Sequence, residues 1–255
     1  MNFILIIPLL IGWISGWIVN YLVDVLPATR FLSQPACPSC QTKYKWSDYL
    51  LFRNCSNCGK RRGIRTLIVQ VILTVAPLVI WIFPNHTLPF PLAVFLLVYL
   101  CVVLVIDLEH RLILHPVSIF GAVLGLGIGI FLRSKHSVTN GITSTLLGGA
   151  AAFGVMLVFY FVGELFVKYN SKKHGMSPDE VALGFGDVNL AGILGLMVGW
   201  NAIFYFLFIA IMVGGVVGLL IKVGMLITKR NQAFIAIPYA PFLIASAFYL
   251  LFLLI

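Results

Sequence analysis

Long apolar runs, separated by short polar stretches, dominate the chain from end to end. Runs of about 20 residues are long enough to cross the hydrocarbon core of a bilayer as helices. Seven such runs and one shorter run lie near residues 3–26, 65–83, 89–108, 116–132, 144–167, 188–199, 201–222 and 234–255. The pattern therefore predicts an all-α polytopic membrane protein with about eight transmembrane helices.

Composition and charge placement indicate the same class. Hydrophobic residues make up 61% of the 255 residues and charged residues 10%, with a mean hydropathy of +1.05, which excludes a soluble globule with a polar surface. Fifteen of the 17 Lys and Arg residues fall in loops on one side of the expected bundle, so the positive-inside rule places that side in the cytoplasm. The formal charge of +9 then reflects topology and anionic membrane lipid, and we expect no nucleic-acid partner.

The chain divides by composition into three parts. The first run, 1–26, has no basic start and no small-residue cleavage site, so we expect it to remain as a transmembrane helix. A polar loop follows at 27–64, and the remaining apolar spans form a membrane core at 65–255. The sequence shows no internal repeat, which argues against a transporter built from duplicated halves.

The polar loop carries two C-x2-C pairs, which are separated by fourteen residues. Each pair offers two thiolates to one tetrahedral ion, and a loop of this length is too short to build an adequate hydrophobic core. We therefore predict a structural zinc site with four ligands, Cys37, Cys40, Cys55 and Cys58. Two disulfides are the alternative, which a reducing cytoplasmic location disfavours.

Carboxylates at the edges of apolar helices are costly and often mark function. Asp107 closes the third span, Asp187 opens the short span in "ALGFGDVNLAG", and the expected topology places both at the cytoplasmic side. Two carboxylates held a few ångströms apart share a proton, so they can act together as acid and base toward a water molecule. We therefore predict that Asp107 and Asp187 form a catalytic pair. Asp24 and Glu164 are expected instead to reach the interface or to pair with a nearby Arg.

Two glycines, Gly184 and Gly186, precede Asp187. Without side chains they allow a sharp turn and the close approach of an extended peptide substrate. The alternative is a tight turn in which Asp187 only caps the following helix. Gly12 and Gly16, in the first span, are expected to be close helix contacts.

In this order, the residues resemble the bacterial type IV prepilin peptidases, which are GxGD-type intramembrane aspartyl proteases. The similar stretches are "GWIVNYLVDVLP" (16–27), the double C-x2-C, "IDLEHRLI" around Asp107, "EVALGFGDVNLAGILGLMVGW" (180–200) and "IPYAPFL" (237–243). They extend over nearly the whole chain. The resemblance implies that Asp107 and Asp187 are the catalytic aspartates of a peptidase in the bacterial inner membrane.

The resemblance also implies a substrate and a second activity. Members of the family cut the short basic leader from type IV pilin or pseudopilin precursors on the cytoplasmic side. Many members also methylate the new N-terminal amine with S-adenosylmethionine. Here Thr66, Leu67 and Gln70 stand where the family often has Tyr, Pro and Glu, in the region linked to methylation. We therefore expect cleavage, and we leave methylation with S-adenosylmethionine open. The alternative from another class is a transporter or scaffold whose aspartates bind a cation.

Overall fold

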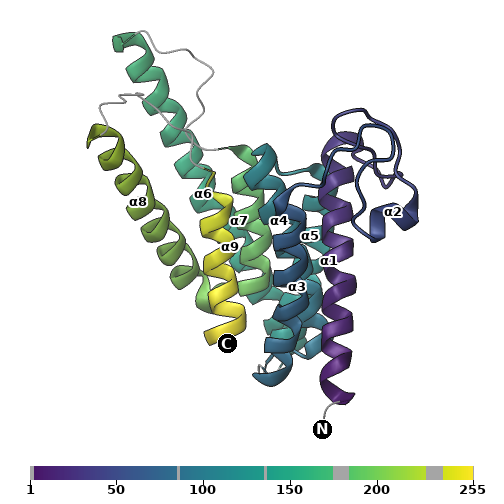
Figure 1. Ribbon diagram of the computed structural model, residues 1–255. Helices are drawn as coiled ribbons and strands as arrows, with labels where there is room; N and C mark the ends of the chain where they lie inside the picture. Colours follow the sequence, from purple (N-terminus) through teal and green to yellow (C-terminus); the bar gives the residue numbers. More distant parts are fainter. Residues whose placement is uncertain (1–2, 85–86, 135–136, 175–183, 228–237, 255) are drawn as a thin grey trace. The chain divides into compact units, whose positions relative to one another are not determined.

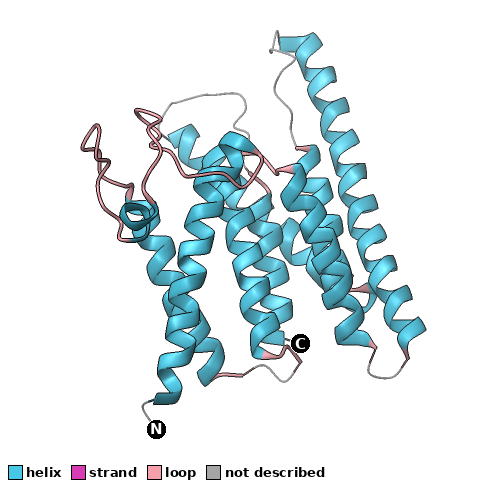
Figure 2. Ribbon diagram, turned by 90° about the vertical axis from the view of Figure 1, so that its right-hand side faces the viewer, coloured by secondary structure: helices cyan, strands magenta, loops and turns pink. Residues whose placement is uncertain are grey.

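Helices build the structure throughout. The computed structural model describes residues 3–84, 87–134, 137–174, 184–227 and 238–254, and in these ranges it contains no strand (Figure 2). The elements are α1 (Phe3–Thr29), α2 (Trp46–Leu50), α3 (Ile64–Ile82), α4 (Phe90–His110), α5 (His115–Arg133), α6 (Val138–His174), α7 (Phe185–Val198), a 3-10 turn (Trp200–Ala202), α8 (Ile203–Ile227), α9 (Ala240–Phe248) and a π-helical end (Tyr249–Leu254). The expectation of an all-α fold is confirmed.

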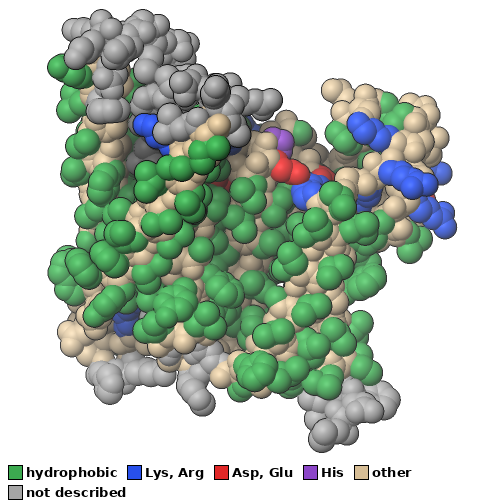
Figure 3. All heavy atoms as spheres, turned by 60° about the vertical axis from the view of Figure 1, so that its left-hand side comes forward, with side chains coloured by type: hydrophobic (Ala, Val, Ile, Leu, Met, Phe, Trp, Pro, Cys, Tyr) green, Lys and Arg blue, Asp and Glu red, His purple; other side chains and the backbone are tan. Residues whose placement is uncertain are grey.

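Most of these helices suit a lipid environment. Among the described residues, α1, α3, α4, α5, α6 and α8 are long and apolar enough to cross a membrane, while α7 and the helix that begins with α9 are apolar but shorter. Hydrophobic side chains cover the outer faces of the helices in Figure 3, and Lys and Arg stand out on the loop between α1 and α3. A helix satisfies its own backbone hydrogen bonds, so a helix with an apolar surface is stable in the hydrocarbon core of a membrane. The protein is an integral membrane protein, and each of the eight expected spans corresponds to a helix.

The chain divides into two compact units, Met1–Ile106 and Asp107–Ile255, with the boundary one turn before the end of α4. In the first unit α1 and α3 lie side by side, and the loop that contains α2 lies beside the end of α1 (Figure 1). Four residues repeat at every fourth position of α1 and therefore share one helix face: Gly12, Gly16, Asn20 and Asp24. This face is the one that contacts α3.

Small and polar groups fill the contact between α1 and α3. A Cβ atom on Gly12 would lie 2.5 Å from a carbonyl oxygen of α3, and one on Gly16 would lie 2.6 Å from Oε1 of Gln70. The Asn20 amide donates a hydrogen bond to the Thr66 carbonyl oxygen at 3.2 Å. The expectation that Gly12 and Gly16 are close helix contacts is confirmed. Thr66 and Gln70, two of the residues that differ from the family pattern, belong to this contact.

In the second unit, α7 packs along α6 and also contacts α5 and α9. Glycines allow the close approach, since a Cβ atom on Gly195 would lie 2.6 Å from the Gly148 carbonyl oxygen. As a result α7 is buried over most of its length from Asp187 onward, while Phe185 at its start is exposed. An acid in that first turn is therefore held inside the unit.

The other end of α7 is held by an arginine. Arg133, the last residue of α5, donates hydrogen bonds to the Gly129 carbonyl oxygen at 2.9 Å and to the Met197 carbonyl oxygen at 2.8 Å, and it also contacts the Val198 carbonyl oxygen. These carbonyls of α7 have no partner within the helix, and a cation at a helix C-terminus is favourable. Gly199 follows with a φ of +74°, and its lack of a side chain leaves room for the guanidinium group.

Candidate active site

The first candidate aspartate lies in the last turn of α4. The helix ends at His110, and the next residue, Arg111, has a left-handed φ of +52° and donates its N–H to the Asp107 carbonyl oxygen at 2.8 Å. Asp107 is only 4% exposed, and its Oδ2 is buried without a hydrogen-bond partner among the described residues. Burying a carboxylate oxygen without a hydrogen-bond partner costs free energy. Asp107 is therefore a candidate functional residue.

The second candidate aspartate is the third residue of α7. The N–H of Asp187 donates to the Gly184 carbonyl oxygen at 3.0 Å. The backbone of Gly184 and that of Ala240, the first residue of α9, lie near its carboxylate. A helix cap needs no burial, and Asp187 is only 9% exposed. Capping alone does not account for these surroundings.

The segments that carry the two aspartates pack together in the second unit. Ile113, just after α4, packs against Gly186, the residue before Asp187, and the two carboxylates are near enough for the charge of one to act on the other. In the parts of the chain that the structure describes, neither carboxylate forms an ion pair with a Lys or Arg side chain. Two neighbouring carboxylates cannot both ionise cheaply, and such a pair can hold one shared proton.

The two glycines of the motif have different surroundings. A Cβ atom on Gly186 would lie 3.0 Å from Cβ of Ile113, so this glycine allows the segment after α4 to pack onto α7. A Cβ atom on Gly184 would meet no atom closer than Oδ2 of Asp187, at 3.7 Å. Among the described residues, the backbone beside Asp187 is therefore open at Gly184 and occupied at Gly186.

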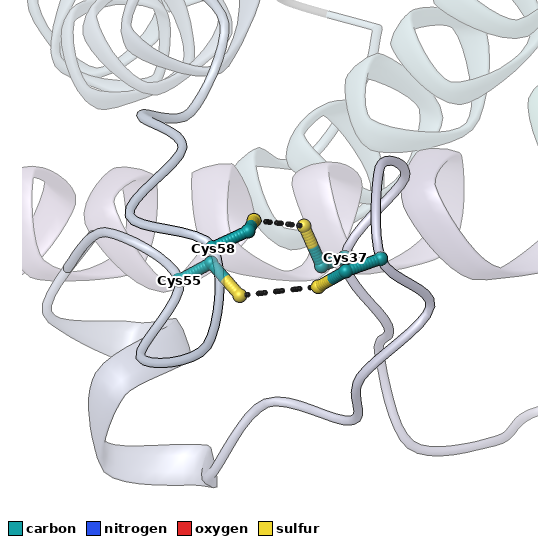
Figure 4. A group of neighbouring side chains, drawn as sticks. Cys37, Cys55 and Cys58 are labelled. Carbon is teal, nitrogen blue, oxygen red and sulfur yellow. Dashed lines mark hydrogen bonds between the residues drawn. The ribbon is translucent and has the colours of Figure 1, made fainter.

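The four cysteines of the loop lie together in the first unit. Their sulfur atoms all lie within 4.8 Å of one another, and the shortest separations are 3.7 Å for Cys37–Cys58 and 3.5 Å for Cys40–Cys55. A tetrahedral ion with Zn–S bonds of about 2.3 Å requires sulfur separations of about 3.8 Å. Figure 4 shows Cys37, Cys55 and Cys58 turned toward one another. All four are free cysteines, so the geometry fits zinc and not two disulfides.

The backbone repeats the same turn at each cysteine pair. After the first pair, Gln41 donates its N–H to the Cys37 carbonyl oxygen at 2.8 Å, and after the second, Gly59 donates to the Cys55 carbonyl oxygen at 2.9 Å. Both Gln41 and Gly59 have positive φ values, +55° and +66°. These turns bring the two sulfurs of each pair to one side of the backbone.

Hydrogen bonds prepare two of the sulfurs as ligands. The Thr42 hydroxyl, 3.3 Å from the sulfur of Cys40, and the Thr42 N–H lower the pKa of Cys40 to about 6. The N–H groups of Cys40 and Ser39 lower the pKa of Cys37. A lowered pKa favours the thiolate, which is the form that binds zinc.

Comparison with known proteins shows what the chain is similar to. Residues 94–219 match the type IV leader peptidase family, and this range contains both aspartates. The chain is also 26% identical, over 231 residues, to a Legionella pneumophila protein named prepilin leader peptidase/N-methyltransferase, a match that covers 87% of this chain and 73% of that protein. No solved structure matches the chain. Both matches agree with the predicted resemblance and support a peptidase.

Two other acids of the chain have basic partners: arginines for Asp24, as predicted, and a lysine for Glu164. Oδ2 of Asp24 accepts hydrogen bonds from the Tyr49 hydroxyl at 2.6 Å and from Arg62 at 3.1 Å, while Arg65 donates to Oδ1. The Arg62 guanidinium also lies over the Tyr49 ring, 3.7 Å from its centroid. This network joins the cysteine loop to α1 and α3. The exposed Glu164 pairs with Lys168, one turn later on α6, at 2.7 Å.

Sequence reasoning missed several residues around the aspartates. Ala240 lies in the stretch "IPYAPFL", which the resemblance includes without a role, and its N–H proves to contact Asp187. Ile113 is an ordinary apolar residue in the sequence, yet it packs on Gly186. The two prolines of the stretch, Pro238 and Pro241, were the available signal, because proline favours the start of a helix.

Proposed function

We propose that this membrane peptidase removes the leader from a type IV prepilin or pseudopilin precursor, with Asp107 and Asp187 as its catalytic pair. The observation that supports the proposal is the burial of one carboxylate from α4 and one from α7, on segments that pack together, with no ion pair to a basic side chain among the described residues. Prepilin is the substrate class in the name of the Legionella pneumophila relative. The sequence resemblance favours the same class.

The chemistry follows from a shared proton. The ionised aspartate takes a proton from a water molecule as the water oxygen attacks the scissile carbonyl carbon, and the protonated aspartate donates to the carbonyl oxygen. The tetrahedral intermediate then collapses, the C–N bond breaks, and the leaving amine receives a proton. The pair returns to its starting state with one proton. Gly184 leaves the backbone beside Asp187 open, which suits the approach of an extended substrate.

The proposed site faces the cytoplasm. The support is the distribution of charge, because the loop between α1 and α3 carries exposed basic residues, among them Lys43, Lys60 and Arg61. Such residues also suit the anionic headgroups of the inner leaflet. A precursor that is itself a membrane helix would present its leader junction at the same interface.

Zinc is the proposed structural cofactor, held by Cys37, Cys40, Cys55 and Cys58. The fit of the sulfur separations supports this ion, and the closed set of four ligands gives it no catalytic position. Its role would be to hold the fold of a short loop that has a core of only a few residues.

Co-expression with a prepilin precursor tests the proposal. We expect Asp107→Asn and Asp187→Asn each to abolish the conversion of precursor to mature pilin on a gel, while both variants remain at wild-type levels in membranes. Cleavage by either variant would refute the assignment. Ion-dependent flux or cation binding with no mature product would favour the transporter or scaffold alternative.

Methylation of the mature pilin is a second candidate activity, favoured by the name of the relative. The mass of the mature N-terminal peptide distinguishes the two outcomes, because a methyl group adds about 14 Da to the product. A free amine is expected if Thr66 and Gln70, which here pack between α1 and α3, no longer serve methyl transfer.

A further inference from the structure

A side-chain hydrogen bond joins the two turns of the cysteine loop. The Asn57 amide, inside the second C-x2-C pair, donates to the hydroxyl oxygen of Thr42, just after the first pair, at 3.1 Å. The same hydroxyl lies 3.3 Å from the sulfur of Cys40. Asn57, Thr42 and Cys40 therefore form a chain of contacts that runs from one turn to a proposed zinc ligand on the other.

A hydroxyl group suits this place between an amide and a thiolate. Its oxygen can accept a hydrogen bond from the Asn57 amide while its hydrogen is donated to a Cys40 thiolate. Hydrogen bonds in such a chain strengthen one another, because the amide polarises the hydroxyl group. Thr42 is half-buried, and its carbonyl oxygen accepts the Cys37 N–H at 2.9 Å, so its backbone is fixed on the first turn.

The second turn has a different residue at the position that matches Thr42. Lys60 occupies it, since its carbonyl oxygen accepts the Cys55 N–H at 3.1 Å. The Lys60 side chain is exposed and forms no hydrogen bond within the described residues, and Cys58 beside it is exposed as well. The hydroxyl next to Cys40 is therefore a feature of this sequence and not of the turn that both pairs share.

We infer that Thr42 and Asn57 are positioning residues of the zinc site, in which the Thr42 hydroxyl, held by the Asn57 amide, fixes the Cys40 sulfur as a ligand. This inference rests on the proposed zinc site and is independent of the peptidase activity. Groups that hydrogen-bond to a metal ligand orient it, and their loss typically weakens metal binding by about 10- to 100-fold. Because Asn57 and Thr42 belong to different turns, their hydrogen bond also holds the two pairs of sulfurs together.

Zinc transfer from the full-length protein in detergent micelles to a chromogenic chelator tests the inference. We expect Thr42→Val, which keeps the shape of the side chain and removes the hydroxyl, to weaken zinc binding by about tenfold. Thr42→Ser keeps the hydroxyl and should bind zinc as the wild type does. Asn57→Ala should weaken binding by a smaller factor, because the hydroxyl remains. Asn54→Ala is its matched control, since Asn54 is exposed next to the second pair and forms no hydrogen bond within the described residues.

Two further measurements distinguish a positioning role from a general loss of loop stability. Asn57→Ala should have little effect in the Thr42→Val background, because both substitutions act through one hydroxyl. With cobalt in place of zinc, Thr42→Val should move the thiolate-to-cobalt charge-transfer band to longer wavelength, and Thr42→Ser should restore it. The reason is that a hydrogen bond draws electron density from a thiolate, so its loss lowers the energy of the transition.

The inference is overturned if Thr42→Val keeps the wild-type zinc affinity, or if Asn57→Ala and Asn54→Ala have equal effects on zinc binding. The second comparison decides the matter by itself where Thr42→Val fails to fold. Purified wild-type protein that holds no zinc would instead overturn the proposed zinc site. The proposed peptidase function is tested separately by the two aspartate variants, whatever the result at Thr42.

Discussion

Asp24 in the first unit and the pair Asp107 and Asp187 in the second are all acids near the ends of apolar helices, yet their surroundings differ. Asp24 accepts hydrogen bonds from two arginines and a tyrosine. Asp107 has a buried oxygen without a partner among the described residues, and in the same residues Asp187 forms no ion pair with a basic side chain. A carboxylate neutralised by arginines stabilises structure, whereas a pair without such partners can exchange a proton. The partners of an acid, and not its position in an apolar helix, separate the two roles.

The largest effect is expected from removing zinc ligands in the first unit. The double variant Cys37→Ser, Cys58→Ser should lose its zinc, because a structural zinc site contributes on the order of 10 kcal/mol to the fold that it holds. Trypsin should then cut the loop at its exposed Lys and Arg residues. Metal analysis and limited proteolysis of the purified protein check both outcomes.

Cys101→Ala is the matched control for that experiment, because Cys101 lies in α4 and outside the group of four. It should retain one zinc ion per chain and resist trypsin. Full zinc content and full protection in the double serine variant would show that the four cysteines do not hold the ion.

A smaller effect is expected from Asp24→Asn. The substitution leaves Arg62 and Arg65 without their carboxylate, and the loop should be destabilised by about 2–4 kcal/mol, the range for breaking a partly buried ion pair. Faster trypsin cleavage at Arg62 and a lower unfolding temperature measure the change. Asp48→Asn is the control: it breaks the exposed pair with Arg53 and should cost less than about 1 kcal/mol. Equal effects of the two variants would contradict the structural role of Asp24.

Arg133→Gln tests the far end of α7. Loss of the charged donor to the last carbonyls of α7 should lower the free energy of unfolding by about 1–3 kcal/mol. Thermal unfolding in detergent measures this change. Lys168→Gln, which removes an exposed pair with Glu164, should cost about 0.5 kcal/mol or less. An unfolding temperature for Arg133→Gln equal to that of Lys168→Gln would show that the arginine does not hold the helix.

The smallest expected effects separate the two glycines beside Asp187. Gly186→Ala should lower kcat by several-fold, because its Cβ atom would press on Ile113 and shift the segment that follows Asp107. Gly184→Ala should instead raise KM with kcat little changed. The added methyl group would reduce only the space beside Asp187 that is open among the described residues, where we propose that the substrate binds. Steady-state kinetics on a prepilin precursor resolve the two constants. The reverse assignment of kcat and KM effects would contradict the distinct roles of the glycines.

Local patterns in the sequence predicted the helices and the metal site. The length and hydropathy of an apolar run are properties of the run itself, so eight helical segments could be located, although α7 and α9 prove short for full spans. The two C-x2-C pairs likewise carry their chemistry in their spacing, so all four ligands of the group could be named.

Contacts between distant segments could not be predicted in the same way. Arg133 served only as evidence for topology, whereas the structure shows that it binds a carbonyl oxygen 64 residues further along the chain. The N–H of Ala240 carries no signal in the sequence, because every residue except proline has one. Its place near Asp187 follows from the packing of α9 against α7.

Cleavage of a prepilin precursor by three single variants in the same membranes tests the contrast between the acids most directly. Asp107→Asn and Asp187→Asn should each yield no mature pilin, while Asp24→Asn should still cleave the precursor despite its weakened loop. Mature pilin produced by either of the first two variants, at wild-type enzyme levels, would contradict the assignment of the catalytic pair.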